Sequence, residues 1–197
     1  MTGKTHLAAG ITAALALVQP QTASLAAACV IGGGLGGLVP DVDARASEQG
    51  RDARVAWLLL AAIVAASLLV DGFSIQSLWA GALDQAGPVP VIAAVVFVGT
   101  CMVGSLTPHR SFMHSILAAV ILTASLWHSL PSLAAPFAVG FASHVALDLL
   151  NSKGVRILFP LKAGFSLGLC HSGGTIDHAI FLVCAFSAIS LLSRVAL

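Results

Sequence analysis

Residues 133–150 read LAAPFAVGFASHVALDLL, an apolar run of the length that crosses a membrane as a helix. Two ionisable residues interrupt it, His144 and Asp148, which are four positions apart and so share one face of a helix. An aspartate at the centre of a membrane helix costs roughly 2.5–3.5 kcal/mol, and less near the interface. Such a side chain needs a partner, and a histidine neighbour with a metal ion would supply one. The alternative is a His–Asp hydrogen bond that only holds helices together.

The whole chain shares this apolar character. Hydrophobic residues make up 58% of its 197 residues and charged residues only 9%, against roughly 45–50% and 25% in soluble domains. The net charge of +1 offers no basic patch for nucleic acid. The four cysteines form no CxxC pair, so we expect no disulfide. The composition predicts an integral membrane protein and excludes a soluble protein, a disordered chain and a nucleic-acid-binding module.

Seven apolar segments follow one another along the chain, and their long Ala, Leu and Val runs without period-two alternation indicate helices rather than a barrel. They cover residues 7–18, 23–39, 55–70, 89–106, 114–127, 133–150 and 176–192. The last five are full spans, whereas the first two form either full crossings or a re-entrant hairpin. We therefore expect an all-α, polytopic membrane protein with about five to seven transmembrane or re-entrant helices in one bundle, and a single domain over residues 1–197.

The basic residues orient these spans, because cytoplasmic loops of membrane proteins are enriched in Lys and Arg. With a cytoplasmic N-terminus, eight of the nine lie on the inner side and Arg194 alone lies outside. The inner set is Lys4, Arg45, Arg51, Arg54, Arg110, Lys153, Arg156 and Lys162. We therefore expect a protein of a bacterial-type inner (plasma) membrane with its N-terminus in the cytoplasm.

The first aspartates and the first histidine lie at this predicted inner face. His6 begins the first segment, and Asp41 and Asp43 end the second. Pro40 favours an extended backbone after it, which would point both carboxylates to one side. The alternative for this Asp-x-Asp pair is a polar helix cap.

The turn between two spans carries two further histidines. His109 and His114 are five positions apart, about 140° on a regular helix, so they share a site only if the turn is irregular. Pro108 favours such a turn, with a helix that begins near Ser111. Arg110 fits phosphate or carboxylate oxygens, or else anchors the chain at the membrane interface.

Imidazole and carboxylate side chains together favour a divalent metal, Zn²⁺ before Mn²⁺. The candidate ligands are His6, Asp41, Asp43, His109, His114, His144 and Asp148. They exceed the need of one catalytic zinc ion, which favours more than one ion. Asp43 is also a candidate catalytic base, and Arg110 a candidate binder of an anionic transition state.

The order and spacing of several motifs add a resemblance that runs nearly from end to end. The motifs are Thr5-His6 with Gly10; Gly37-Leu38-Val39-Pro40-Asp41-Val42-Asp43 with Ser47 and Gly50; His109-Arg110-Ser111-Phe112-Met113-His114-Ser115; Ser143-His144 with Asp148, Asn151, Gly154 and Pro160; and Asp177. In these motifs the chain resembles the YdjM-type membrane-bound metal-dependent hydrolases. Met113 and Ala44 depart from the family pattern, in which Thr and His stand there, so a ligand role is lost at position 44. His144-x-x-x-Asp148 is also faintly similar to a helix of zinc-dependent phospholipase C.

These resemblances imply a hydrolase, and the fainter one favours a phosphoester of a lipid as substrate. The predicted reaction is attack by a metal-activated water on a phospholipid or lipid phosphate at the cytoplasmic interface, with the bilayer as partner. The alternatives are a proton or metal-ion transporter and a non-catalytic membrane scaffold. Transporters place their binding residues near the midplane on broken helices, and only the glycine-rich run 32–37 suits such a break.

Overall fold

The computed structural model describes residues 1–44 and 89–195, and these residues form a bundle of helices. Its α-helices are α1 (Gly3–Val18), α2 (Ala23–Leu38), α5 (Val89–Ser105), α6 (Ile116–Ser129), α7 (Pro131–Leu149) and α8 (Thr175–Val195), with two 3-10 helices, η1 (Val39–Asp43) and η2 (Phe112–His114). The predicted all-α class is confirmed. The expected span 55–70 lies outside the described residues, as do Ser47 and Gly50 of the motifs.

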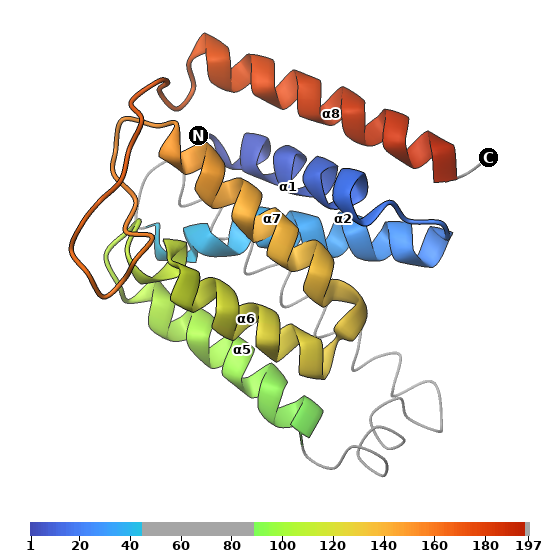
Figure 1. The fold of residues 1–197 in the computed structure, drawn as a ribbon, viewed down its shortest axis with the longest axis horizontal. Helices are drawn as coiled ribbons and strands as arrows, with labels where there is room; N and C mark the ends of the chain where they lie inside the picture. Colours follow the sequence, from blue (N-terminus) through green and yellow to red (C-terminus); the bar gives the residue numbers. More distant parts are fainter. Residues whose placement is uncertain (45–88, 196–197) are drawn as a thin grey trace.

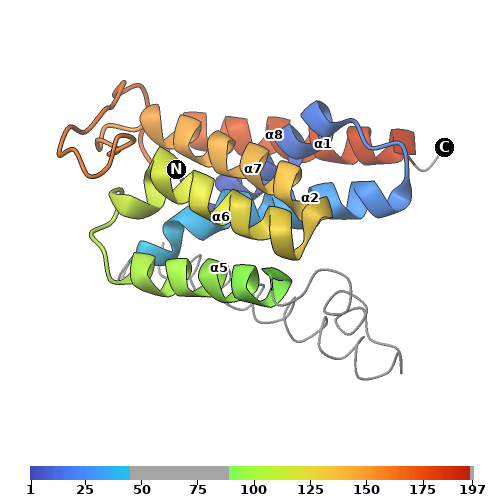
Figure 2. The same ribbon diagram turned by 60° about the horizontal axis from the view of Figure 1, so that its bottom comes forward.

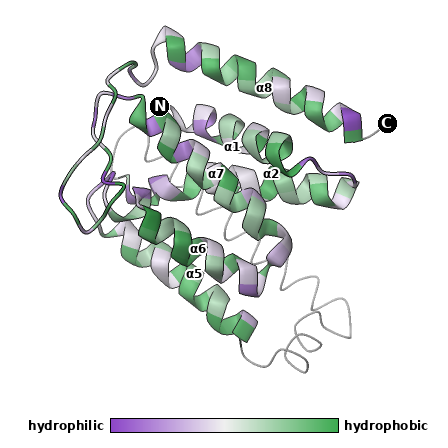
Figure 3. Ribbon diagram, in the orientation of Figure 1, coloured by the Kyte–Doolittle hydropathy of each residue, from purple (hydrophilic) through white to green (hydrophobic). Residues whose placement is uncertain are grey.

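Three helices, α1, α2 and α7, pack against one another at the centre of the bundle (Figure 1). Helix α8 packs on α1, while α6 packs on α7 and α5 packs on α6 (Figure 2). The long loop 150–174 lies at one end of the bundle, beside the N-terminus (Figure 1). Hydrophobic residues cover most of the helices, and hydrophilic residues concentrate at helix ends and in loops (Figure 3). This distribution is typical of a helical membrane bundle.

Three helical stretches in the described part are long and apolar enough to cross a membrane. They are Ala23–Asp43, Pro131–Leu149 and Thr175–Val195. Helices α1, α5 and α6 are apolar but shorter. Helix α8 exposes Leu182, Val183 and Phe186, as expected of a helix that faces lipid.

The glycine-rich part of α2 is a continuous helix, so α2 lacks the break that a transporter would use. A Cβ atom on Gly33 would lie 2.6 Å from the carbonyl oxygen of Gly10 and 2.7 Å from the Cβ of Ala14. A Cβ atom on Gly36 would collide with the carbonyl oxygen of Phe137 on α7. Small residues allow membrane helices to approach this closely. The glycines therefore hold the end of α2 directly between α1 and α7.

The predicted extended backbone after Pro40 is wrong. Residues Val39–Asp43 form the 3-10 helix η1, which continues α2 after a hydrogen bond from the Val39 N–H to the Leu35 carbonyl. The fixed φ of proline is compatible with a helix, and 3-10 turns are frequent at helix ends. Asp41 is therefore aimed by a tightened helix end rather than by a strand.

The turn before α6 is irregular, as the sequence indicated, but α6 begins later than predicted. Arg110 adopts a left-handed backbone with φ of 63°. Helix α6 begins at Ile116 rather than near Ser111. The reason is the side chain of Ser115, which accepts a hydrogen bond of 3.2 Å from the Ala118 N–H and caps the helix.

A bulkier residue at position 33 should separate α1 from α2. We expect Gly33→Val to lower the free energy of unfolding by about 1–3 kcal/mol, because overpacking displaces backbone that has no room to move. Denaturation in detergent micelles measures this effect. Gly99→Val on α5 is the matched control, since a Cβ atom there meets nothing within 4 Å. Equal stability of the two variants would contradict the role assigned to the glycine contacts.

Candidate metal centre

The seven predicted ligands come from four segments of the chain and meet at one end of the bundle. They form two groups, and within each group one ligand atom per residue lies within 4.8 Å of the others. The groups are Asp41, Asp43, His109 and His114, and His6, His144 and Asp148. All are buried except His109, whose side chain is 27% exposed. The structure thus brings every candidate ligand together, while their metal binding stays a prediction.

Four ligand atoms lie close together where the two groups adjoin. His114 Nε2 lies 3.2 Å from His144 Nε2, 3.6 Å from Asp41 Oδ1 and 3.5 Å from Asp148 Oδ2. His144 Nε2 lies 3.7 Å from the same Asp41 oxygen. Most of these separations are too long for a good hydrogen bond. They are close to the ~3.3 Å that separates two ligands at 2.0–2.1 Å from a tetrahedral zinc ion.

A backbone carbonyl fixes the proton on His144. Its Nδ1 donates a hydrogen bond of 2.7 Å to the carbonyl oxygen of Gly37. The other nitrogen, Nε2, therefore presents a lone pair towards His114. Metal-binding histidines in proteins are commonly held in this way, with the second nitrogen donating to a carbonyl or carboxylate. Two imidazole nitrogens that face each other need a proton or a cation between them.

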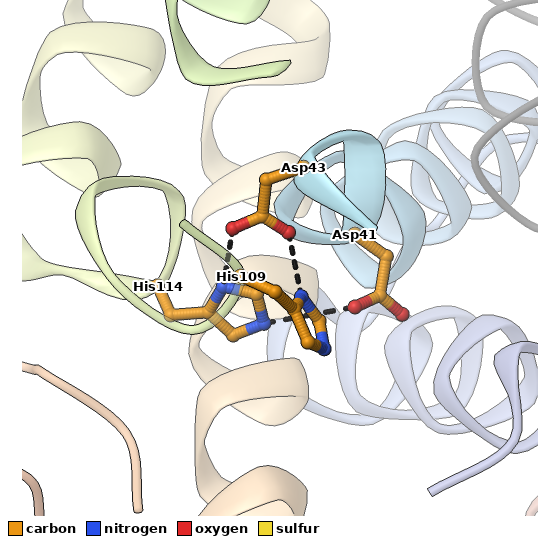
Figure 4. Close-up of side chains that lie close together, drawn as sticks. All are labelled: Asp41, Asp43, His109 and His114. Carbon is orange, nitrogen blue, oxygen red and sulfur yellow. Dashed lines mark hydrogen bonds and ion pairs between the residues drawn. The ribbon is translucent and has the colours of Figure 1, made fainter. Parts of the chain in front are cut away.

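Asp43 contacts both histidines of the α5–α6 turn (Figure 4). Its Oδ1 accepts a hydrogen bond of 2.7 Å from His109 Nδ1, and its Oδ2 lies 3.6 Å from His114 Nδ1. The second oxygen is buried and makes no hydrogen bond, nor does His109 Nε2. Asp43 therefore lies on the Nδ1 side of both rings. The Nε2 atom of His114 points to the other candidate ligands.

His6 reaches the centre from the first turns of α1. Its ring stacks on the ring of His144, with centroids 3.9 Å apart, and its Nε2 lies 3.4 Å from Asp148 Oδ1. Its Nδ1 is buried and makes no hydrogen bond. The close packing of α1 on α2 and α7 is what brings this histidine to the centre.

The positive charge at the centre is distributed unevenly. Asp148 Oδ1 accepts a hydrogen bond of 3.1 Å from the guanidinium of Arg110 and lies 3.2 Å from the amino group of Met1. The other two carboxylates, Asp41 and Asp43, contact only histidines among the described residues. Buried carboxylates need a compensating charge. A protonated histidine or a metal ion can supply it.

His114 shows how strongly the centre attracts positive charge. Burial by itself lowers the pKa of this histidine, but its contacts with Asp148, Asp41 and Asp43 outweigh burial and raise the pKa well above 6.5. These contacts therefore favour a proton on His114, where the candidate ligands converge. A metal ion bound by His114 Nε2 would have to displace that proton, since only neutral imidazole binds metal.

Asp177 is buried at the same end of the bundle but belongs to neither group of candidate ligands. Its carboxylate accepts hydrogen bonds from the backbone N–H groups of Thr2 at 3.1 Å and Gly173 at 2.7 Å. It thereby ties the start of the chain to the start of α8. The signal for it in the sequence is a single acidic residue at the start of an apolar helix. The carbonyl groups of Gly37 and Lys153, which hold His144 and Arg110, have no signal in the sequence.

Comparisons with known proteins give a family but no activity. A family model for the YdjM inner membrane protein matches residues 1–196. The uncharacterized protein YvsG of Bacillus subtilis (strain 168) is 26% identical over 187 residues, which cover 92% of this chain and 88% of that protein. No solved structure matches. The fainter similarity to phospholipase C finds no support in these comparisons.

Removal of two central ligands should lower the metal content. We expect purified wild-type protein to contain at least about one zinc or manganese ion per chain, and His144→Ala/Asp148→Ala to contain less, because the group of His6, His144 and Asp148 then keeps only one of its three ligands. Inductively coupled plasma mass spectrometry of detergent-purified protein measures the content. His128→Ala is the control, since this exposed histidine lies at the far end of α6. Folded wild-type protein that binds no added metal would exclude a metal centre.

Proposed function

The chain belongs to the YdjM family of inner membrane proteins, and we propose that it is a metal-dependent hydrolase that acts on a phosphoester of a lipid at the cytoplasmic face of the membrane. One observation carries the proposal, namely the convergence of Asp41, His114, His144 and Asp148 on one small space within an apolar bundle. Mixed imidazole and carboxylate ligands are typical of hydrolytic zinc sites.

The proposed reaction is hydrolysis at phosphorus. A bound divalent ion would lower the pKa of a water molecule and draw charge from a phosphoryl oxygen. Water adds to phosphorus, the bond from phosphorus to the lipid oxygen breaks, and a lipid alcohol and a phosphate leave. Zn²⁺ suits the ligand set best, with Mn²⁺ as the alternative, and seven ligands in two adjoining groups favour more than one ion.

The chain supplies the orientation that such a centre requires. Gly37 fixes the tautomer of His144 through its carbonyl oxygen. Asp43 accepts a hydrogen bond from His109 Nδ1 and lies 3.6 Å from His114 Nδ1, and from that position its charge increases the basicity of the Nε2 atoms of both rings. Asp43 therefore acts as a positioning residue, or as a ligand or base through the oxygen that makes no hydrogen bond.

Arg110 has two roles in the proposed mechanism. Its Nη atoms donate to Asp148 at 3.1 Å and to the carbonyl oxygen of Lys153 at 2.7 Å, which neutralises the carboxylate and fixes the guanidinium. Its Nε–H is buried without a hydrogen bond. A guanidinium held this firmly beside the centre can stabilise the additional negative charge of a phosphoryl transition state.

The two alternative functions receive less support from the described residues. The candidate ligands lie at one end of the bundle, whereas transporters place their sites near the midplane on broken helices. Helix α2, which the glycine run made the best candidate for a break, is continuous. In a scaffold we would expect these side chains to pair through hydrogen bonds. Most of the separations between the central ligand atoms are instead 3.5–3.7 Å. These observations favour a catalytic centre.

Loss of the Asp43 carboxylate should reduce the rate of turnover more strongly than it reduces the metal content. We expect Asp43→Asn to lower the rate of lipid phosphoester hydrolysis about 10–100-fold while metal remains bound, because residues that orient metal ligands have effects of that size. The assay measures the lipid alcohol released from phosphatidate and phosphatidylglycerol in mixed micelles, together with inorganic phosphate from the first lipid and glycerol phosphate from the second. His128→Ala should match wild type. A metal-loaded wild-type protein that hydrolyses neither lipid would contradict the proposed substrate class.

The cytoplasmic location of the centre can be tested independently of activity. Loop 150–174 lies at the same end of the bundle as the candidate ligands, and the α6–α7 junction lies at the other end. In a background without native cysteines, we expect Lys162→Cys to be shielded from an impermeant thiol reagent added to intact cells, and Ser132→Cys to react. Both should react after lysis. The reverse pattern would place the centre on the outer side.

A further inference from the structure

An apolar groove runs along the outside of the bundle between α6 and α7, which lie side by side in Figures 1 and 2. Its volume is about 690 Å³, within the range of sites that bind small molecules. The walls are almost entirely hydrophobic, and Ile116, Val120 and Trp127 along its edge are exposed. The groove is therefore open to the surroundings of the bundle, which in a membrane are lipid chains.

The groove exists because one stripe of α7 carries only small side chains. Ala138, Ala142 and Ala146 are four positions apart and line the groove, with Phe141 and Val145 as its deeper wall. Larger residues at these positions would fill the space and pack against α6, as residues elsewhere in the bundle do. The space therefore follows from the sequence of α7 and not from a gap between poorly fitted helices.

The groove leads to the candidate metal centre. One end of the groove is lined by His114, Ser115 and Ile157. The side chain of His114 is completely buried, its Nδ1 makes no hydrogen bond, and its Nε2 faces His144 and the two central carboxylates. A ligand in the groove would thus have an apolar part between two helices and a polar end beside His114, which among the seven candidate ligands is the one that lines the groove. Such a ligand has the amphipathic form of a membrane lipid.

The length of the groove fits one leaflet of a bilayer. The lining residues of α6 extend from Ile116 to Trp127, which is about 17 Å at 1.5 Å per residue. Half of a hydrocarbon core of about 30 Å is about 15 Å. A lipid whose headgroup lies at the interface can therefore place one chain along the whole groove.

We propose that the groove between α6 and α7 binds a single hydrocarbon chain of an anionic phospholipid and so directs the phosphate headgroup to His114 and the adjoining centre. This assignment rests on the proposed function, and it adds the site that recognises the lipid chain. The walls are as apolar as the surrounding lipid, so a chain gains no hydrophobic free energy on entry. The groove aligns the substrate, and a bound metal ion together with Arg110 would supply the attraction for the phosphate.

A photoreactive lipid distinguishes this groove from the general lipid surface. The probe is lysophosphatidate with a diazirine in its single acyl chain, added to the metal-loaded protein in phosphatidylcholine vesicles. We expect adducts to concentrate in peptides of α6 and α7, to be displaced by unlabelled lysophosphatidate, and to fall at least about tenfold in Ala142→Phe. Ala179→Phe on the exposed surface of α8 is the matched control and should label like wild type.

The outcomes separate the groove from the hydrolase. Adducts spread evenly over the helices, or unchanged in Ala142→Phe, overturn the groove assignment even if the lipid is hydrolysed. Adducts confined to the groove without hydrolysis support the groove and count against the hydrolase. Native mass spectrometry that shows a dimer without groove adducts would assign the groove to a second copy and overturn the proposal. Metal content confirms that Ala142→Phe is folded, and Ala146→Leu replaces it if it is not.

Discussion

Negative charge buried inside an apolar bundle is the constraint on which the rest of this structure depends. Asp41, Asp43 and Asp148 are withdrawn from water at one end of the helices, and carboxylates in such surroundings are costly without compensation. Arg110 neutralises one of them directly. Among the described residues the other two pair with histidines, and these contacts raise the pKa of His114, which favours a positive charge there. The same arrangement favours a divalent cation.

Close helix packing makes this arrangement possible. The glycines of α2 allow both α1 and α7 to touch its backbone. As a result His6 on α1 stacks on His144 of α7, and the carbonyl of Gly37 reaches the same imidazole. The glycine run, which in sequence suggested a break in the helix, instead positions the ligands. Because these glycines carry no side chains, the three helices pack closely, and this close packing aligns the residues of the centre.

In the proposed function, the centre and the groove would divide the recognition of a lipid between them. The centre offers charge and ligand atoms at the end of the bundle, and the groove offers a path for a chain along α6 and α7. His114 belongs to both. An enzyme that works on lipids must draw the headgroup into a polar site without extracting the chain from its apolar surroundings. A groove that opens to lipid along its length meets this condition.

The sequence by itself determined the helical membrane class, the limits of the described helices to within a few residues and the set of side chains that gather at one end, because hydrophobic composition and the 3.6-residue period are local properties. It did not determine the conformation after Pro40, where the chain forms a 3-10 helix in place of the predicted extended backbone. It also did not determine the start of α6, which the Ser115 cap sets at Ile116. The separations between ligand atoms and the place of Asp43 behind two imidazoles appeared only in the folded chain. These features depend on contacts between residues that are distant in sequence. They also depend on backbone carbonyls, which every residue has and which therefore leave no signal in the sequence. Only the packing of the helices determines them.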